Sequence, residues 1–393
     1  MNIAFITPEY ITEQGFDGGL ANYLYKVSKA LQNRGHNIFI IVGSHENRSF
    51  IHDDINVIRV NLSSKWLTMA NKLLRGRLQA PLTWLMNSKK LNIALKVLHT
   101  DKKIDVAQFA SYTAPGFFRP KSIPSICRIS SFQPMFDKAH GLSISRSRSL
   151  QYYLEVQALK KSDAIFGPSQ LIGEIISQEV GKAVKIIESP LSSKIESDDQ
   201  MYNDYLVNKK YMLFFGTLGL IKGVKDIADI LPELLAQNKD LYFVFVGKNT
   251  DFQGKPMMDY VWHKAADERG RCLYLGSLRQ EFLQTIIEKS LAVVLPSHID
   301  NFPNTCIESM SKSKIVIGTR GASFEQLIDD RVNGFLCDIE SPKSLLKSIN
   351  KVLQLDVDEK ARIEKNAGET TNRLKPDLIA EQLEDFYHKV INS

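Results

Sequence analysis

The chain has 393 residues and is 44% apolar, which is more than one hydrophobic core usually absorbs and favours two domains. No run of eighteen apolar residues occurs and residues 1–7 do not resemble a signal peptide, so we expect a cytosolic protein without a membrane span. The net charge of +6 is uneven: residues 1–195 carry 25 Lys and Arg against 14 Asp and Glu, or +11, and the remainder carries 25 against 30, or −5. The basic half should meet something anionic, and phospholipid, a lipid diphosphate and nucleic acid all remain open.

Short apolar runs rich in β-forming residues alternate with helical patterns, which is typical of parallel sheets built from strand-helix-strand units. The first helix is predicted over 20–34, after the first strand. Residues 191–209 are polar and without periodicity, which indicates a linker. Strands are predicted at 2–7, 37–43, 56–60, 106–110, 125–130, 164–169 and 184–189 in the first half, and at 211–216, 241–247, 272–276, 291–296, 314–319 and 334–337 in the second.

Two doubly wound domains are therefore predicted, at 1–195 and 196–393, with the ligand site in a cleft between them. The last helix, at about 376–391, falls in the second range, and its packing back on the first domain is left open. No GxGxxG motif follows either leading strand, which counts against a dinucleotide oxidoreductase. The four cysteines form no CxxC pair and are interpreted as buried reduced thiols.

The most informative stretch is residues 295–310. A strand is predicted to end at Ser297, a short loop carries Asp300, and a helix begins with Pro303 at a first-turn position that needs no N–H. Glu308 follows one turn inside this helix. Two carboxylates eight residues apart thus bracket a helix N-terminus.

The first turn of this helix suggests a ligand. Free amides at Asn304, Thr305 and Cys306, together with the helix dipole, would favour a phosphate. Asp300 could then hold sugar hydroxyls and Glu308 a ribose diol. Spacing alone does not separate this interpretation from a solvated loop acid and a surface helix acid.

The stretch resembles the E-x7-E signature of retaining glycosyltransferase family four, a group with a GT-B fold. Residues 216–223, Gly-Thr-Leu-Gly-Leu-Ile-Lys-Gly, resemble the glycine turn and Lys-Gly pair of that family. The resemblance is close over 210–340 and loose in the N-terminal half. Further motifs in the family's order are Val246-Gly247-Lys248, Leu275-Gly276-Ser277, and Gly318 to Gly321 through Glu325 to Asn333-Gly334-Phe335.

The resemblance implies an α/β GT-B fold, with two Rossmann-like doubly wound domains facing across a cleft. The N-terminal domain would bind the acceptor and the C-terminal domain the nucleotide-sugar donor, with a UDP-sugar favoured. It implies retaining transfer of a hexosyl or N-acetylhexosaminyl group to a glycan or lipid-linked acceptor, in surface polysaccharide or glycoconjugate synthesis. No metal or other cofactor is expected, because Lys222 and helix-end amides would stabilise the leaving diphosphate. No nucleic-acid partner is expected either.

The predicted catalytic residues are Asp300 and Lys222, the latter as a mobile point charge beside the diphosphate. Gly18 and Gly19 precede the first helix and would let the backbone approach the donor phosphates, although such a pair also fits an ordinary turn. The predicted donor-binding residues are Gly18, Gly19, Gly216, Thr217, Asn304, Thr305, Cys306 and Glu308.

Three departures from the family pattern affect these roles. The first acid is Asp300 instead of Glu, which shortens its reach by one methylene. Thr217 stands where the family often has Arg, which leaves Lys222 more of the charge. Ser130 and its neighbour occupy the place of a common His, so Arg128 and Ser130 are candidates for the acceptor side.

Residues 61–103 concentrate the basic excess, with nine Lys and Arg against Asp101 alone. Within them, segment 65–90 combines Trp66 and Trp84 with basic residues. One interpretation is a helix that binds anionic lipid at the inner face of the cell membrane. The other is an amphipathic helix packed on the N-terminal sheet.

Two functions from other classes remain as alternatives. A GT-B-type sugar-nucleotide epimerase would share the nucleotide site but needs no acceptor surface. A nucleic-acid-binding protein would explain the basic half, but no stacking aromatic platform accompanies the charge, and the donor motif would go unexplained. Asp356 and Asp358 look like a metal motif but are interpreted as helix-capping residues.

Overall fold

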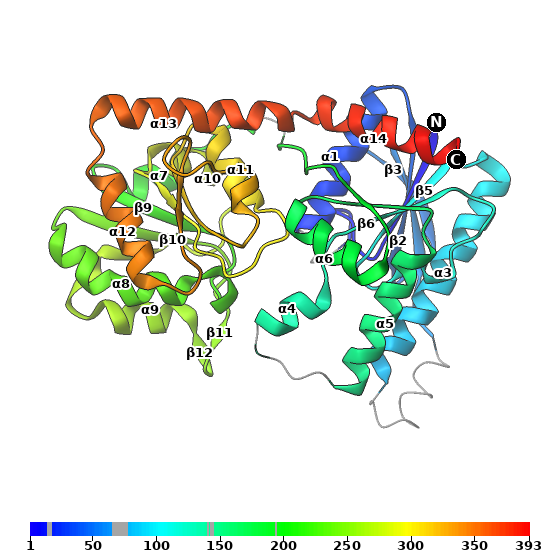
Figure 1. Ribbon diagram of the computed structural model, residues 1–393, viewed down its shortest axis with the longest axis horizontal. Coiled ribbons are helices and arrows are strands. Elements are labelled where there is room, and N and C mark those ends of the chain that lie inside the picture. The colour runs from blue at the N-terminus through cyan, green and yellow to red at the C-terminus, as the bar shows by residue number, and fades with distance from the viewer. Residues whose placement is uncertain (14–17, 65–77, 140, 142–144, 193–194) are drawn as a thin grey trace. The chain divides into compact units, whose positions relative to one another are not determined.

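A computed structural model describes residues 1–13, 18–64, 78–139, 141, 145–192 and 195–393 (Figure 1). The chain forms two compact units, of which unit 1 comprises Met1–Pro190 and Leu374–Ser393, and unit 2 comprises Leu191–Arg373. The final segment thus belongs to unit 1, whereas the predicted range 196–393 placed it in the second domain. None of the described helices is both long and apolar enough to cross a bilayer.

Unit 1 contains an eight-stranded sheet with the order β3-β4-β2-β1-β5-β6-β7-β8. All neighbouring strands are parallel except β3, which pairs antiparallel with β4. The strand order reverses between β1 and β5, and ligands of such sheets bind where the order reverses. The strands are β1 (Asn2–Thr7), β2 (Asn37–Ser44), β3 (Arg48–His52), β4 (Ile55–Asn61), β5 (Val106–Ala110), β6 (Ser125–Arg128), β7 (Ala164–Gly167) and β8 (Val184–Ile186).

Apolar helix faces cover the sheet of unit 1. On α3, Leu91, Leu95 and Leu98 recur at helical spacing and pack against buried residues of β1, β2 and β5. On α5 and α6, a second cluster packs against β6 and β7. The helices are α1 (Gly19–Asn33), α3 (Gln79–Lys102), the 3-10 turn η1 (Pro115–Phe118), α4 (Gln133–Ala139), α5 (Arg146–Lys161), α6 (Gln170–Val180) and α14 (Pro376–Ile391).

Helix α14 completes unit 1 from the far end of the chain. It lies beside α1 (Figure 1), where the Glu384 carboxylate accepts a hydrogen bond from Arg34 Nε at 2.7 Å. Deeper in the unit, the buried Tyr387 hydroxyl donates to Gln108 Oε1 of β5 at 2.5 Å. These two side-chain hydrogen bonds attach α14 to α1 and to β5, so α14 is an integral part of unit 1.

Unit 2 contains a six-stranded parallel sheet with the order β13-β10-β9-β14-β15-β16. Its order reverses between β9 and β14, so the ligand edge of this unit lies at the carboxyl ends of those strands. A short antiparallel hairpin, β11 with β12, stands apart from the sheet. The strands are β9 (Lys210–Phe215), β10 (Leu241–Val246), β11 (Asp251–Phe252), β12 (Lys255–Pro256), β13 (Cys272–Tyr274), β14 (Val293–Val294), β15 (Val316–Thr319) and β16 (Phe335–Cys337).

Helices flank this second sheet, and the Asp356 side chain caps one of them by accepting from the Glu359 N–H at 2.8 Å, as the capping interpretation predicted. The helices and 3-10 turns are α7 (Gln200–Tyr205), η2 (Leu220–Lys222), α8 (Val224–Gln237), α9 (Met257–Ala265), η3 (Ala266–Arg271), α10 (Gln280–Lys289), α11 (Asn304–Ser311), η4 (Phe324–Gln326), α12 (Pro342–Leu353), α13 (Val357–Thr370) and η5 (Thr371–Leu374).

Two elements correct the sequence prediction. The predicted linker 191–209 contains α7, which packs against α10. Just before α7, the Asp198 N–H donates to the Glu281 carbonyl of α10 at 3.0 Å. Six helical residues are too few to show a periodicity. Strand β3 was missed because its residues are mostly exposed and form no apolar run.

Candidate functional site

The two predicted catalytic residues meet at the ligand edge of unit 2. Lys222 ends the 3-10 turn η2 after β9, and Asp300 lies in the loop after β14. The Lys222 Nζ donates to Asp300 Oδ2 at 2.5 Å. Their side chains are 32% and 15% exposed, so this ion pair is only partly screened by solvent and remains accessible to a ligand.

Glycines bring the backbone of three loops together at this edge. Gly247 has φ 135°, and a Cβ there would lie 1.9 Å from the Gly216 carbonyl oxygen. Gly223 has φ 72°, and its Cβ would lie 1.9 Å from the Pro296 carbonyl oxygen. A Cβ at Gly216 would come within 3.9 Å of the Thr305 side chain. The glycine turn after β9 therefore faces the first turn of α11.

The start of α11 differs in detail from the prediction. Pro303 is the residue before the helix, and no side chain caps it. The Cys306 N–H donates to the Pro303 carbonyl at 3.0 Å, so this amide is not free as the prediction had it. The N–H groups of Asn304 and Thr305 have no acceptor inside the helix, and with the helix dipole they suit an anion.

Glu308 and Thr217, which were also predicted to bind the donor, belong to α11 and to the glycine turn after β9. Glu308 is one turn beyond Asn304, and residues at this spacing share a helix face. Its side chain is half-buried, whereas Thr217 is exposed directly after Gly216. Burial raises the pKa of the Cys306 thiol, so this group stays protonated and takes no nucleophilic part.

Two supporting residues were missed by sequence reasoning. The buried Thr319 hydroxyl donates to the Ser297 carbonyl at 2.6 Å, and the Ser323 hydroxyl donates to the Asp300 carbonyl at 3.0 Å. Both bonds fix the backbone of the loop that carries Asp300. Hydroxyl side chains at strand ends are common, so nothing in the sequence distinguished these two.

Of the residues predicted in unit 1, Gly18, Gly19 and Ser130 lie in segments that follow strands of its sheet. Gly18 precedes α1 and Gly19 begins it, and both are exposed. A Cβ on Gly18 would lie 3.7 Å from Glu9 Oε1, which places that carboxylate beside the glycine pair. The Ser130 hydroxyl accepts from the Tyr112 N–H at 3.2 Å, which joins the loops that follow β5 and β6.

Arg128 does not line the acceptor side as predicted. Its side chain is 6% exposed, its guanidinium lies 3.5 Å from the Tyr23 ring centroid, and its Nη2 donates to Ser189 Oγ at 3.2 Å. Residues alternate between the two faces of a strand, so Cys127 lies on the opposite face from Arg128. Burial lowers the pKa of Arg128 from the ordinary guanidinium value.

The basic aromatic segment predicted at 65–90 is only partly described. Residues 65–77, Trp66 among them, lie outside the described residues. Trp84 is 9% exposed and packs with Leu154 in an apolar cluster, so it is not a membrane anchor. Lys90 Nζ donates to the Asn61 carbonyl at 3.0 Å. For residues 78–90, these contacts favour a helix packed on unit 1, although Trp84 contacts residues outside the sheet that the packed-helix interpretation named.

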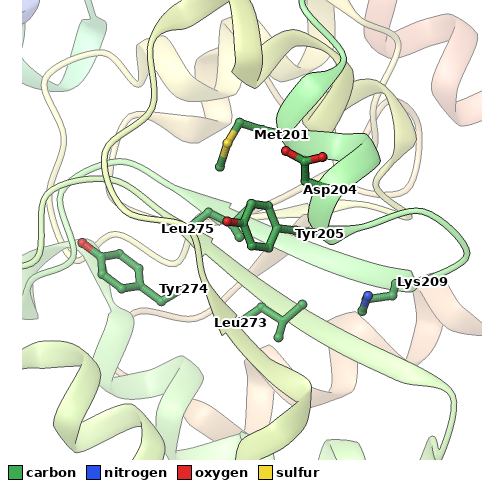
Figure 2. A pocket seen from close by; sticks show the side chains of 7 residues that line it. All are labelled: Met201, Asp204, Tyr205, Lys209, Leu273, Tyr274 and Leu275. Atoms are coloured by element: carbon green, nitrogen blue, oxygen red, sulfur yellow. The ribbon is translucent and has the colours of Figure 1, made fainter.

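A separate pocket of about 370 Å³ lies between α7 and the edge strand β13 (Figure 2). None of the predicted donor residues lines it. The pocket is lined by Met201, Asp204, Tyr205, Lys209, Leu273, Tyr274 and Leu275.

Over the described part of the chain, no three His, Cys, Asp or Glu side chains are placed to hold a metal ion.

Both halves of the sequence match known families. A profile described as Glycosyl transferases group 1 matches residues 203–370, and a profile described as Glycosyltransferase Family 4 matches residues 17–190. The chain is 23% identical over 190 residues to the spore coat protein SA of Bacillus subtilis, which is 47% of this chain and 50% of that protein. The match thus spans about half the length of this curated relative.

Solved structures resemble the whole chain. Sucrose-phosphate synthase of Thermosynechococcus elongatus has a TM-score of 0.77 at 14% identity over 100% of both chains. Anabaena HepE, solved with UDP and with UDP-glucose, has a TM-score of 0.70 at 18% identity over 99% of this chain and 100% of that one. At such identities the likeness establishes the fold, and it confirms the predicted α/β GT-B class with two Rossmann-like domains.

Proposed function

Because the chain belongs to the GT4-like group 1 glycosyltransferases, we propose that it transfers a sugar from a nucleoside diphosphate sugar to an acceptor bound by unit 1. The observation that carries the proposal is the contact between Lys222 and Asp300 beside the open first turn of α11. A cation, a carboxylate and unpaired amides at one strand edge suit a diphosphate joined to a polyhydroxylated group.

Each part of the donor has a proposed partner in unit 2. Lys222 and the N–H groups of Asn304 and Thr305 neutralise the charge that develops on the leaving diphosphate. Asp300 accepts hydrogen bonds from sugar hydroxyls once Lys222 turns to the phosphate. Glu308, further along α11, accepts from the ribose hydroxyls. Transfer in this proposal retains the anomeric configuration and uses no metal.

A UDP-sugar is the proposed donor, with glucose or another hexose, or an N-acetylhexosamine, as the transferred group. Support comes from the solved complexes of the structurally similar Anabaena protein with UDP and UDP-glucose. The acceptor is proposed to be a glycan or a lipid-linked glycan of surface polysaccharide or glycoconjugate synthesis.

The test of this proposal is donor turnover. A panel of nucleotide sugars is first scored by the rise in unfolding temperature, because a ligand that binds only the folded state stabilises it. The best donor is then incubated with and without candidate acceptors. Release of nucleoside diphosphate only when acceptor is present supports transfer, whereas conversion of the donor to an epimer without acceptor would support the epimerase alternative.

Association with a membrane is proposed through α3 and not through Trp84. Helix α3 exposes Ile93 and Val97, at 54% and 68%, one turn apart. Lys89 and Lys96 are exposed on the same helix at interleaved positions. Aliphatic side chains among lysines suit an anionic bilayer surface, where the ammonium groups meet lipid phosphates.

A further inference from the structure

His298 lies in the loop between β14 and α11, two residues before Asp300. Its imidazole Nε2 is 2.7 Å from Asp226 Oδ2, and both side chains are nearly buried, at 9% and 8% exposed. On its other side, Nδ1 is 3.4 Å from the exposed Glu340 carboxylate. The ring is therefore fixed between a buried acid of α8 and a surface acid that precedes α12.

The backbone of His298 contacts the same part of the unit. Its N–H donates to the Ile221 carbonyl at 2.8 Å, and Ile221 directly precedes Lys222. The close approach of Gly223 to the Pro296 carbonyl joins the two loops at a second point. The loop and the turn thus touch twice through their backbones, and the His298–Asp226 hydrogen bond adds a side-chain contact between the loop and α8, which follows the turn.

The Lys222–Asp300 ion pair has one member in each of these two segments. Lys222 belongs to the turn before α8, and Asp300 belongs to the loop that contains His298. A shift of one loop against the other would move the Lys222 ammonium relative to Asp300 and to the open amides of α11. Displacements of about 1 Å at a reacting centre can reduce a rate by about a hundredfold.

We propose that His298, held by Asp226, is a positioning residue that keeps Lys222 and Asp300 in register for sugar transfer. The proposal rests on the proposed function for its kinetic consequence, but the register itself is a property of the folded protein. His298 touches neither donor nor acceptor in this scheme. It acts through Lys222, so its effect depends on whether Lys222 is present.

Five variants test this role by kinetics. His298→Ala removes the bond to Asp226, and kcat should fall about tenfold or more while the KM for donor changes less than about threefold. His298→Gln keeps an N–H donor near the Nε2 position and should recover most of kcat. His263→Ala removes an exposed histidine of α9 and should stay within about twofold of the wild type. In a Lys222→Ala background, His298→Ala should cost little more, because contacts that act as a unit are not additive.

A second measurement does not need turnover. A water-soluble carbodiimide joins an amine and a carboxylate that are in contact, so the Lys222–Asp300 amide should form in the wild type and be found by mass spectrometry. Its yield should drop severalfold in His298→Ala and return in His298→Gln, with thermal unfolding showing that each variant is folded.

The two measurements separate the possible failures. If the wild type transfers no sugar from any donor, the proposed function fails, and the cross-link still decides the role of His298. An unchanged cross-link yield in folded His298→Ala overturns the positioning role. So does a wild-type kcat in that variant, or a full additional loss of kcat in the Lys222→Ala background.

Discussion

Lys222 and Asp300 lie 78 positions apart in the chain, yet the ammonium of one donates a hydrogen bond to the carboxylate of the other at 2.5 Å. Strand β9, the first of unit 2, leads to Lys222. Strand β14, which pairs with β9, leads to Asp300. Parallel pairing of β9 and β14 thus brings the two charges to one edge of the sheet.

Replacing the lysine tests its role in the chemistry. Thr217 carries no charge, so Lys222 is the cation beside the diphosphate in our proposal, and Lys222→Ala should lose about 2 kcal/mol or more of transition-state stabilisation. The measurement is kcat/KM with the best donor. Lys239→Ala, whose side chain is 78% exposed at the surface, serves as the control. Full activity of Lys222→Ala would assign the diphosphate to another residue.

The two carboxylates should separate binding from turnover. Glu308→Ala should weaken the affinity for nucleoside diphosphate about tenfold, because ribose hydroxyls lose a charged acceptor. Asp300→Ala should leave that affinity within about threefold and lower kcat, since this residue meets the transferred sugar. Calorimetric titration with nucleoside diphosphate distinguishes the two, and unchanged affinity in Glu308→Ala would remove the ribose assignment.

Glycine positions differ in what a side chain would meet. Gly247 and Gly254 both have positive φ, of 135° and 78°, but a Cβ at Gly247 would collide with the Gly216 carbonyl while nothing lies within 4 Å of Gly254. Gly254→Ala should cost about 1 kcal/mol of unfolding free energy through strain alone, and Gly247→Ala about 3 kcal/mol or more. Urea unfolding of both variants measures the difference, and equal costs would mean that the loops at the donor edge are able to move apart.

The buried Glu155 of α5 should make the stability of unit 1 fall as pH rises. Its side chain is 2% exposed, and burial raises its pKa from 4.5 to about 8, despite a hydrogen bond from the Gln133 N–H. Between these values the folded protein holds a proton that the unfolded chain has released, so stability falls as pH rises, by at most about 1.4 kcal/mol per pH unit.

Glu155→Gln should remove this dependence and match or exceed the wild type in stability at pH 8. The exposed Glu174→Gln should behave like the wild type throughout. Urea unfolding at several pH values between 5 and 8 is the measurement. A wild-type slope in Glu155→Gln would assign the dependence to other groups.

Membrane association should depend on the exposed face of α3. Changing Lys89 and Lys96 to Glu should release the protein from anionic vesicles, as should raised salt, because the attraction is screened. Lys160→Glu, an exposed lysine of α5, is the matched control. Sedimentation with anionic and neutral vesicles decides, and equal recovery of the wild type in the supernatant with both would exclude this surface.

The strands were the most predictable part of the fold. Strands β1 and β5 begin and end where the apolar runs 2–7 and 106–110 do, because parallel strands buried on both faces need continuous apolar sequence. Exposed β3 carries no such signal, and neither does the six-residue α7.

The candidate site was predictable in kind and less so in detail. The sequence marks the two strand ends that lead to Lys222 and Asp300, but their hydrogen bond is visible only in the structure. The hydrogen bond from the Cys306 amide to Pro303 depends on the geometry of one helical turn, and Arg128 is buried against Tyr23 and Ser189, which lie far from it in the chain. His298 was invisible as a positioning residue, because its partner Asp226 comes 72 residues earlier in the chain.

Helix α14 has a consequence for the order in which the protein matures. During synthesis the ribosome makes all of unit 2 before residues 376–391, so the Gln108 side chain has no Tyr387 hydroxyl to accept from until unit 2 has been made. Of the two units, unit 1 therefore begins folding before unit 2 and is completed after it. A chain cut short before α14 would contain every residue of the donor site, yet the domain damaged by the loss would be the one made earliest.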